Sequence, residues 1–316
     1  MVSPLVVSLR KQKGCYGSRV KLISPAKINL YLNILGEYRS PVPTKKDQFC
    51  RIESIVERIS LFDEITVTVQ KTPNIEIAVD EEDFKVNDNL CCRAAELLKK
   101  TFSLPFGFRI KLKKKIPVGS GLGGGSSNAA TVLLGISMLL GLKMRQEDLY
   151  SLGAALGSDV NFFLSRSPFA YLSGRGEKVS LIQGEKLHHF VIWPKVILPT
   201  KKVYQAYRSD SSKKLAVGRG RVKLTKFFSN VKIMKYALKR GDVFLLKKST
   251  FNILERYALA LCKEVRQVKD YLERRGICAK VTGSGSALYT IMERSSLSRI
   301  RGILPKKWLV FTAHTF

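Results

Sequence analysis

No apolar run in the 316-residue sequence approaches the ~20 residues that a membrane-spanning helix needs. We therefore expect no membrane-embedded segment. A short apolar patch over residues 4–9 precedes Arg10, Lys11 and Lys13, which is the reverse of the order in a secretory signal. A cytoplasmic location is the simplest expectation, and a plastid location stays open.

Residue types that bind metals are also scarce. The chain has three histidines and six cysteines, without a C-x-x-C pair or the spacing of a zinc site. We therefore predict no metal centre built by the protein itself. Without an export signal, the cysteines are expected to be reduced thiols.

Acidic residues are few, at 25 against 55 lysines and arginines, which gives a net charge of +30. The basic excess is concentrated at Lys111–Lys115 and between Lys201 and Arg240. It could be a solvated surface, a field that draws in small polyanionic substrates, or a nucleic-acid surface. Aromatic residues interleave sparsely with these cations, which disfavours a nucleic-acid stacking platform.

Hydrophobic periodicity predicts an α+β protein with two halves that meet near residue 174. A strand is expected over residues 21–35, interrupted at Ser24, Pro25 and Ala26, and a helix is expected from Asn89 with Asn87 or Asp88 as its N-cap. Further strands are expected at 65–69, 75–79, 108–112, 190–193 and near 281–292, and further helices at 127–140, 146–156, 225–247 and 251–275.

The segment Pro117–Asn128 is the most informative part of the sequence. It has five glycines within seven positions, 119–125, and leads into an apolar helical pattern. Glycine lets backbone N–H groups approach a ligand closely, and a helix N-terminus adds free donors and partial positive charge. This combination predicts a phosphate-binding loop.

Several known phosphate loops fit this segment poorly. A Walker loop requires a lysine after its last glycine, and none is present. The Gly119-x-Gly121-x-x-Gly124 pattern matches the Rossmann fingerprint formally, but the preceding strand alternates with lysines and no acidic residue ends a following strand. The glycine loop of protein kinases lies between two strands. A flexible linker would have polar flanks, whereas a strand and an apolar helix flank this loop.

Three motifs together resemble the GHMP small-molecule kinases. They are the loop Pro117–Asn128, the segment Ser24–Leu30 before it, and Thr282–Ser286 after it. Within that superfamily, Pro25–Asn29, Gly123–Ala130 and Leu156–Phe163 are most similar to the branch that phosphorylates the 2-hydroxyl of 4-diphosphocytidyl-2-C-methyl-D-erythritol. The resemblance spans residues 21–292. It implies a ribosomal-S5-like ATP-binding domain over residues 1–173 and a ferredoxin-like α/β substrate domain over residues 174–316.

The resemblance also implies roles for individual residues. Lys27 and Asp159 would be catalytic, with Asp159 accepting the hydroxyl proton and Lys27 stabilising developing negative charge. ATP would bind to Pro117, Val118, Gly119, Ser120, Gly121, Leu122, Gly123, Gly124, Gly125, Ser126 and Ser127. Substrate would bind to Asn29, Phe49, Cys50, Asn128, Thr200, Tyr204, Gly283, Ser284 and Gly285. Mg²⁺ is implied by the use of ATP, with a hydroxyl of Ser126 or Ser127 as a contact, and a monomer or homodimer is expected.

The sequence departs from the family where the cytidine should bind. The family pattern D-G-Y-H reads Asp47-Gln48-Phe49-Cys50 here, after an insertion around residues 39–46. Phe49 retains a ring that can stack on a base, whereas Cys50 is a poor replacement for a histidine donor. Two alternatives therefore stay open: another GHMP enzyme of the homoserine or mevalonate type, and a basic nucleic-acid-binding protein with a vestigial kinase fold.

Overall fold

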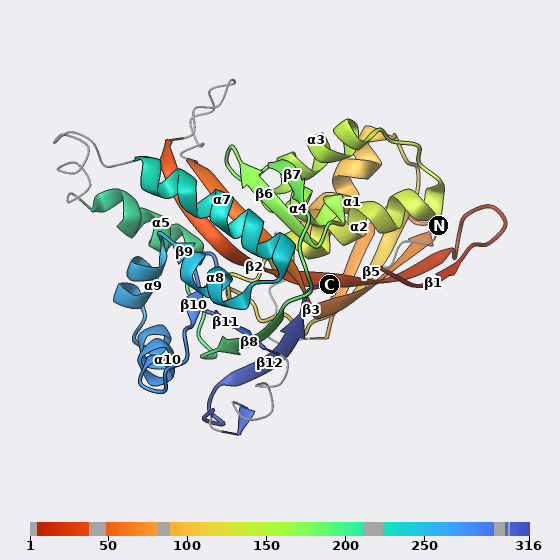
Figure 1. Ribbon diagram of the computed structural model, residues 1–316. Coiled ribbons are helices and arrows are strands. Elements are labelled where there is room, and N and C mark those ends of the chain that lie inside the picture. Colours follow the sequence, from red (N-terminus) through yellow and green to blue (C-terminus); the bar gives the residue numbers. More distant parts are fainter. Residues whose placement is uncertain (1–4, 38–48, 81–88, 211–223, 294–300, 303) are drawn as a thin grey trace.

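The computed structural model describes residues 5–37, 49–80, 89–210, 224–293, 301–302 and 304–316, and within 224–230 the backbone alone. Its strands form an eight-stranded and a four-stranded sheet (Figure 1). Helices cover both, as expected for an α+β protein. No helix in the described ranges combines the length and apolar character needed to cross a membrane.

The large sheet has the order β1-β2-β3-β5-β4, with β6, β7 and β9 attached beside this path. Its strands are β1 (Val6–Arg10), β2 (Arg19–Glu37), β3 (Cys50–Gln70), β4 (Ile75–Val79), β5 (Gly107–Lys113), β6 (Phe169–Ser173), β7 (Lys178–Ile182) and β9 (Phe251–Asn252). The small sheet has the order β10-β11-β8-β12. Its strands are β8 (His188–Trp193), β10 (Lys280–Val281), β11 (Leu288–Met292) and β12 (Leu309–His314).

The helices are interspersed with these strands along the chain. They are α1 (Leu90–Thr101), α2 (Gly124–Leu140), α3 (Gln146–Leu156), α4 (Val160–Ser165), α5 (Thr200–Ser209), α7 (Leu224–Arg240), α8 (Val243–Ser249), α9 (Glu255–Leu261) and α10 (Lys263–Glu273). Helices α1–α4 gather on one side of the large sheet, and α9 and α10 lie beside the small sheet (Figure 1). One apolar core lies between α1–α4 and the large sheet, and two more lie around the small sheet.

Strand β2 does not stop at residues 24–26, where an interruption was expected. It pairs with β3 on both sides of that point, with a shift in register between Pro25 and Ala26. A proline cannot donate to the ladder, and a bulge tolerates it while it re-aims the following side chains. Lys27 comes directly after this irregularity. The bulge at Pro25 and Ala26 therefore also sets the direction of the Lys27 side chain.

The two long helices expected in the second half are each broken. Helix α7 ends at Gly241, whose φ of +65° suits glycine, and Asp242 caps α8 by accepting a hydrogen bond from the Leu245 N–H at 2.9 Å. The segment expected as a helix from residue 251 begins as strand β9 and is interrupted again at Cys262, which is extended. Helix α1 is capped by Asn89 rather than by residue 87 or 88, which lie outside the described ranges.

Strand β9 joins the second half of the chain to the first, because it pairs in parallel with β2. The predicted domain boundary near residue 174 lies between β6 and β7, which pair with each other. That boundary stays a prediction. For the site, the important result is that β2 pairs with strands from both halves of the chain, β3 and β9.

Candidate active site

The glycine loop and the start of α2 form one continuous element whose backbone suits a phosphate. Helix α2 begins at Gly124, with Gly123 as its N-cap at φ +72°, three residues earlier than expected. The first helical hydrogen bond runs from the Ser127 N–H to the Gly123 carbonyl at 2.9 Å. The N–H groups of the preceding turn are therefore free to bind an anion.

The loop packs directly against the third motif, far away in the sequence. The Ala287 N–H donates to the Ser120 carbonyl at 2.9 Å, and the Lys27 N–H donates to the Leu122 carbonyl at 2.9 Å. Gly121 has φ +79°, and a Cβ there would lie 2.4 Å from the Thr282 carbonyl oxygen. Glycine is required at this position both by its conformation and by the close approach of the two loops.

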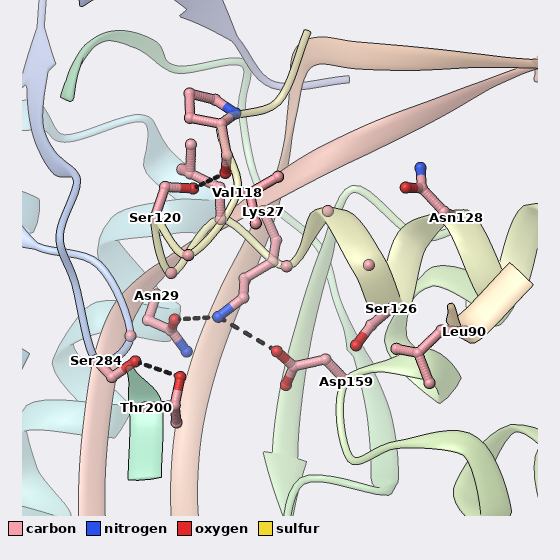
Figure 2. Close-up of a pocket in the computed structure, with 18 of the residues that line it drawn as sticks. Lys27, Asn29, Leu90, Val118, Ser120, Ser126, Asn128, Asp159, Thr200 and Ser284 are labelled. Atoms are coloured by element: carbon pink, nitrogen blue, oxygen red, sulfur yellow. Dashed lines mark hydrogen bonds and ion pairs between the residues drawn. The ribbon is translucent and has the colours of Figure 1, made fainter. Parts of the chain in front are cut away.

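A cavity of about 450 Å³ opens in front of this loop. Figure 2 shows its lining, with the loop on one side and Asp159 opposite Lys27. Its lining comprises Lys27, Asn29, Leu32, Ile52, Asn89, Leu90, Lys114, residues 117–126, Asn128, Asp159, Thr200, Tyr204, Gly283 and Ser284.

Lys27 connects the loop to the proposed base. Its Nζ lies 3.4 Å from Asp159 Oδ2 and donates to Asn29 Oδ1 at 2.5 Å (Figure 2). The Lys27 side chain is 6% exposed and the Asp159 side chain 30% exposed. The ammonium is thus held inside the protein, while the carboxylate remains open to a substrate.

Asn29 is fixed from three directions. Its Nδ2 donates to Ser54 Oγ at 2.9 Å, and Ser54 Oγ donates to the Tyr31 carbonyl at 2.6 Å. Its backbone N–H donates to Thr282 Oγ1 at 3.0 Å, which ties β2 to the third motif. Because the Asn29 side chain is held in this way, its oxygen fixes the position of the Lys27 ammonium.

A second cavity, of about 890 Å³, shares part of its lining with the first. Ile52, Ser126, Asp159, Thr200 and Tyr204 line both. The remaining lining of the second cavity is Phe49, Cys50, Ser158, Arg175, Lys201, Gln205, Arg208 and Ser209. Asp159 therefore lies where the two cavities meet.

Helix α5 supplies one wall of the second cavity. Thr200, Tyr204 and Arg208 line it, and their spacing of four residues places them on one helix face. Thr200 Oγ1 lies 2.9 Å from Ser284 Oγ, which anchors the start of α5 to the third motif. Burial and the nearby carboxylate of Asp159 raise the pKa of Tyr204, so the Tyr204 ring stays neutral at physiological pH.

Phe49 and Cys50 form the opposite wall. Phe49 is 37% exposed, and the Arg175 guanidinium lies over its ring, 4.9 Å from the centroid. Cys50 is buried, and Arg208 Nη2 lies 3.7 Å from its sulfur. The two residues that precede Phe49 in the motif, and the insertion over 39–46, lie outside the described ranges.

The structure brings together nearly all of the site residues expected from the sequence. Ser127 and Gly285 are the exceptions, since neither lines either of the two cavities described above. The Ser127 hydroxyl accepts a hydrogen bond from Ser24 at 2.8 Å, and the Gly285 N–H donates to the Thr282 carbonyl at 2.9 Å within its turn. Their roles in binding stay predictions, and both residues support the loops structurally.

The sequence interpretation found Lys27 but missed four other cations that line the cavities. Lys114 lines the first, and Arg175, Lys201 and Arg208 line the second. Lys114 precedes the loop by three residues, and Arg208 follows Tyr204 by one helical turn. The helical spacing in α5 was a usable signal for Arg208, whereas Arg175 reaches Phe49 only through tertiary folding.

The acidic residues of the site suit a metal ion carried by a nucleotide. Asp159 is the only carboxylate that lines either described cavity, and the described residues contain no group of three or more His, Cys, Asp or Glu placed to hold a metal. Mg²⁺ is commonly held by one or two carboxylates together with substrate phosphates and water. The site therefore fits an ion that is held largely by substrate phosphates.

The fold and the site define a GHMP kinase. The family model for the GHMP kinases N terminal domain matches residues 89–166, and the GHMP kinases C terminal model matches residues 234–309. A homoserine kinase structure from Cytophaga hutchinsonii, 17% identical, superposes with a TM-score of 0.68 over 98% of this chain and 97% of that one. At that identity, the similarity establishes the fold alone.

Relatives with higher sequence identity show to which family of GHMP kinases the chain belongs. The 4-diphosphocytidyl-2-C-methyl-D-erythritol kinase of Clostridioides difficile is 30% identical over 87% of each chain. That of Alkaliphilus metalliredigens is 33% identical over 86% of this chain and 88% of its own. A crystal structure of 4-(cytidine 5'-diphospho)-2C-methyl-D-erythritol kinase, 28% identical, has a TM-score of 0.69 and covers 93% of this chain and 98% of that one. The chain belongs to the 4-diphosphocytidyl-2-C-methyl-D-erythritol kinase family.

Proposed function

We propose that this kinase transfers the γ-phosphoryl group of ATP to the 2-hydroxyl of 4-diphosphocytidyl-2-C-methyl-D-erythritol. The products are the 2-phosphate and ADP, and the reaction belongs to the non-mevalonate route to isoprenoid precursors. The observation that carries the proposal is the position of Asp159 at the junction of two cavities, 3.4 Å from Lys27.

The nucleotide is proposed to bind in the cavity in front of the glycine loop. The loop N–H groups and the N-terminus of α2 face this cavity and suit a chain of phosphates. Five basic side chains line the two cavities against the single carboxylate of Asp159, namely Lys27, Lys114, Arg175, Lys201 and Arg208. Such an imbalance favours polyanionic substrates on both sides of the site.

The acceptor is proposed to bind in the second cavity. Phe49 and Tyr204 offer rings for a pyrimidine base, a contact worth about 1–3 kcal/mol per base. Arg175, Lys201 and Arg208 lie in the same cavity and can pair with a diphosphate. The cavity thus has the two features that a nucleoside diphosphate ester requires.

The reaction needs a proton acceptor and a cation at the point of transfer. As the 2-hydroxyl oxygen bonds to the γ-phosphorus, the bond from that phosphorus to the bridging oxygen breaks and ADP leaves. Asp159 accepts the hydroxyl proton. Lys27, held by Asn29, stabilises the negative charge on the oxygens in transfer.

Mg²⁺ is proposed to enter with ATP. Ser126 and Asp159 line the nucleotide cavity and are the residues that would contact it. The ion would neutralise phosphate charge.

The two alternatives fit less well. Homoserine is a zwitterion with no net charge, so it gains less from the three cations of the second cavity than a diphosphate does. Neither homoserine nor mevalonate has a ring to stack on Phe49 or Tyr204. A nucleic-acid-binding role does not explain why Lys27 pairs with Asp159 in an open cavity.

We also propose a cytoplasmic enzyme, supported by six cysteines that are all free thiols. Whether it acts as a monomer or a homodimer is best settled by light scattering.

Comparative turnover tests the proposed function. ADP release is measured with 4-diphosphocytidyl-2-C-methyl-D-erythritol, homoserine and mevalonate under equal conditions. We expect kcat/KM for the first to exceed that for the other two by at least about a thousandfold. Equal or greater turnover of homoserine or mevalonate would overturn the acceptor assignment.

A further inference from the structure

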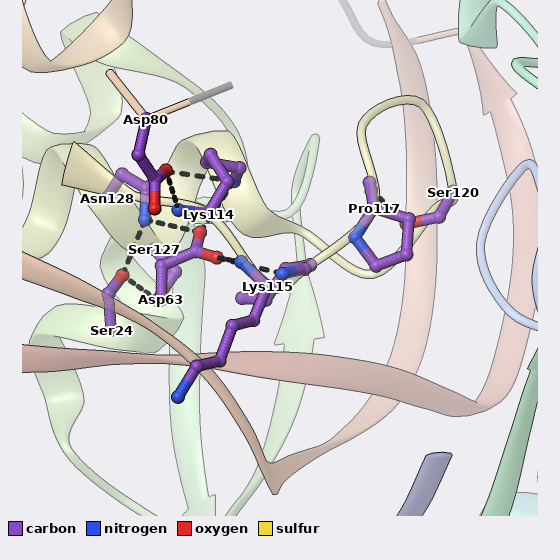
Figure 3. A network of polar contacts seen from close by, with 10 residues as sticks. Ser24, Asp63, Asp80, Lys114, Lys115, Pro117, Ser120, Ser127 and Asn128 are labelled. Carbon is purple, nitrogen blue, oxygen red and sulfur yellow. Dashed lines mark hydrogen bonds and ion pairs between the residues drawn. The ribbon is translucent and has the colours of Figure 1, made fainter. Parts of the chain in front are cut away.

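Asp63 is a buried carboxylate beneath the glycine loop that plays no part in the chemistry above. It lies in β3 with no exposed surface. Oδ1 accepts the backbone N–H groups of Lys115 at 2.7 Å and Ile116 at 2.8 Å. Oδ2 accepts from Lys114 Nζ at 2.5 Å and from Asn128 Nδ2 at 2.9 Å (Figure 3).

These four donors lie at both ends of the glycine loop. Lys114, Lys115 and Ile116 directly precede Pro117, and Asn128 lies in the first turns of α2. The pairing of β3 with β5 ends at Glu64 and Lys113. Beyond that point the Lys114 N–H donates to Asp80 Oδ1 at 2.8 Å, and the next two backbone N–H groups donate to Asp63. Asp63 therefore contacts the chain both where the loop leaves the sheet and where it returns in α2.

A second set of hydrogen bonds continues from Asn128 to other residues of β2 and α2. Asn128 Nδ2 also donates to Ser24 Oγ at 2.9 Å, and Ser24 Oγ donates to Ser127 Oγ at 2.8 Å. Ser24, Ser127 and Asn128 are all buried. A buried polar network in which the members satisfy one another is rigid, so the first turns of α2 have a fixed position relative to β2 and β3.

The same carboxylate determines where Lys114 lies. The Lys114 side chain is 6% exposed and lines the nucleotide cavity. Its Nζ is held by Asp63 and lies 3.4 Å from Asn128 Oδ1. Without a carboxylate at position 63, a buried ammonium would lose its charge partner and move.

We propose that Asp63 is a positioning residue for the nucleotide. By holding both ends of the glycine loop and the ammonium of Lys114, it fixes the arrangement of donors that the phosphates meet. It touches neither the acceptor nor the reacting atoms, so its loss weakens nucleotide binding and leaves the acceptor cavity unchanged. The inference depends on the proposed ATP site but not on the identity of the acceptor.

The test is Asp63→Asn. The amide retains an oxygen for the two backbone N–H groups, but its NH₂ faces the donors of Lys114 and Asn128. We expect the Kd for ADP, measured by calorimetry, and the KM for ATP to rise at least about tenfold. The KM for the acceptor and kcat stay within about threefold of the original values.

A complementary exchange separates positioning from stability. In Asp63→Asn/Asn128→Asp, the carboxylate newly placed at position 128 can accept from both the amide at position 63 and Lys114. We expect this exchange to restore most of the ADP affinity lost in Asp63→Asn. The matched control is Glu64→Gln, the neighbouring acid, which pairs with Lys21 and Lys115 on the surface; it should leave ADP binding unchanged.

Ser24→Ala is the replacement test if the Asp63→Asn variant does not fold. It leaves the pair of Asp63 and Lys114 in place and removes only the hydroxyl that connects Asn128 to Ser127. We expect the Kd for ADP to rise about threefold with the acceptor KM unchanged.

Two results would overturn the proposal. One is a folded Asp63→Asn enzyme, or Ser24→Ala in its place, with a lower melting temperature but an unaltered Kd for ADP. The other is an exchange variant that folds without regaining ADP affinity. Absence of turnover with the diphosphocytidyl acceptor would instead count against the proposed function, since ADP binding is measured without an acceptor.

Discussion

The Nζ of Lys27 lies 3.4 Å from Oδ2 of Asp159, although one residue comes from the middle of β2 and the other precedes α4. Both residues belong to the first half of the chain, and elements from both halves support their positions. The glycine loop contacts Lys27 through the Leu122 carbonyl, and the third motif contacts Asn29 through Thr282. The pair is thus placed where phosphates and acceptor meet.

Asp159→Asn tests the proton acceptor. The amide has the same shape but cannot take a proton, so we expect kcat to fall by about a thousandfold or more while the Kd for ADP changes less than about threefold. The control is Asp148→Asn, whose carboxylate forms an exposed pair with Arg145 on α3. A near-normal kcat in Asp159→Asn would show that another group accepts the proton.

Lys27→Met tests the cation at the point of transfer. Methionine keeps the unbranched chain that lies beside Gly123 but removes the ammonium. We expect kcat to fall by about a hundredfold to a thousandfold. Lys21→Met is the control on the same strand, because Lys21 is 40% exposed and forms a surface ion pair with Glu64. Equal losses in the two variants would contradict the assignment.

Arg208→Ala tests the acceptor cavity. The guanidinium lines this cavity and lies beside Cys50, so its loss should raise the KM for the acceptor by about tenfold or more without changing the KM for ATP. The control is Lys202→Ala, an exposed cation of α5 that does not line the cavity. Steady-state kinetics with each substrate varied in turn would distinguish the two. A rise in the KM for ATP alone would place Arg208 on the nucleotide side.

Gly121→Ala tests the contact between the two glycine-rich turns. Gly121 and Gly141 have similar φ values, +79° and +64°, but a Cβ at 141 would meet nothing within 4 Å. Both variants should lose about 1 kcal/mol of unfolding free energy from the left-handed conformation. Gly121→Ala should lose about 2 kcal/mol more, because its Cβ clashes with the Thr282 carbonyl. Urea unfolding measures both, and equal losses would contradict close packing of the turns.

The chemistry-bearing segments could be predicted from the sequence because they are local motifs. The glycine loop, Lys27 and Asp159 each lie within a short recognisable pattern. The strand patterns at 65–69 and 108–112 located the end of β3 and most of β5, whereas residues 50–64 of β3 were not predicted as a strand. These motifs are far apart in the sequence. In the structure they line two neighbouring cavities that share part of their lining.

Features that depend on tertiary contacts could not be predicted in this way. Asp63 lies in an ordinary strand pattern, and only its four partners reveal its place beneath the loop. Arg175 reaches Phe49 across the fold. The breaks at Gly241 and Cys262 were missed because apolar periodicity continues through them, while capping and packing end the helices.

The most direct test of the account is the position of the new phosphate, read from the proton-coupled ³¹P NMR spectrum of the product. Carbon 2 of the acceptor bears the methyl group and no hydrogen, so a phosphate on its oxygen has no three-bond coupling to a proton. We predict a new phosphomonoester singlet that forms with ADP and is absent with the Asp159→Asn enzyme. A phosphomonoester multiplet, or no phosphorylated product from 4-diphosphocytidyl-2-C-methyl-D-erythritol, would contradict the account.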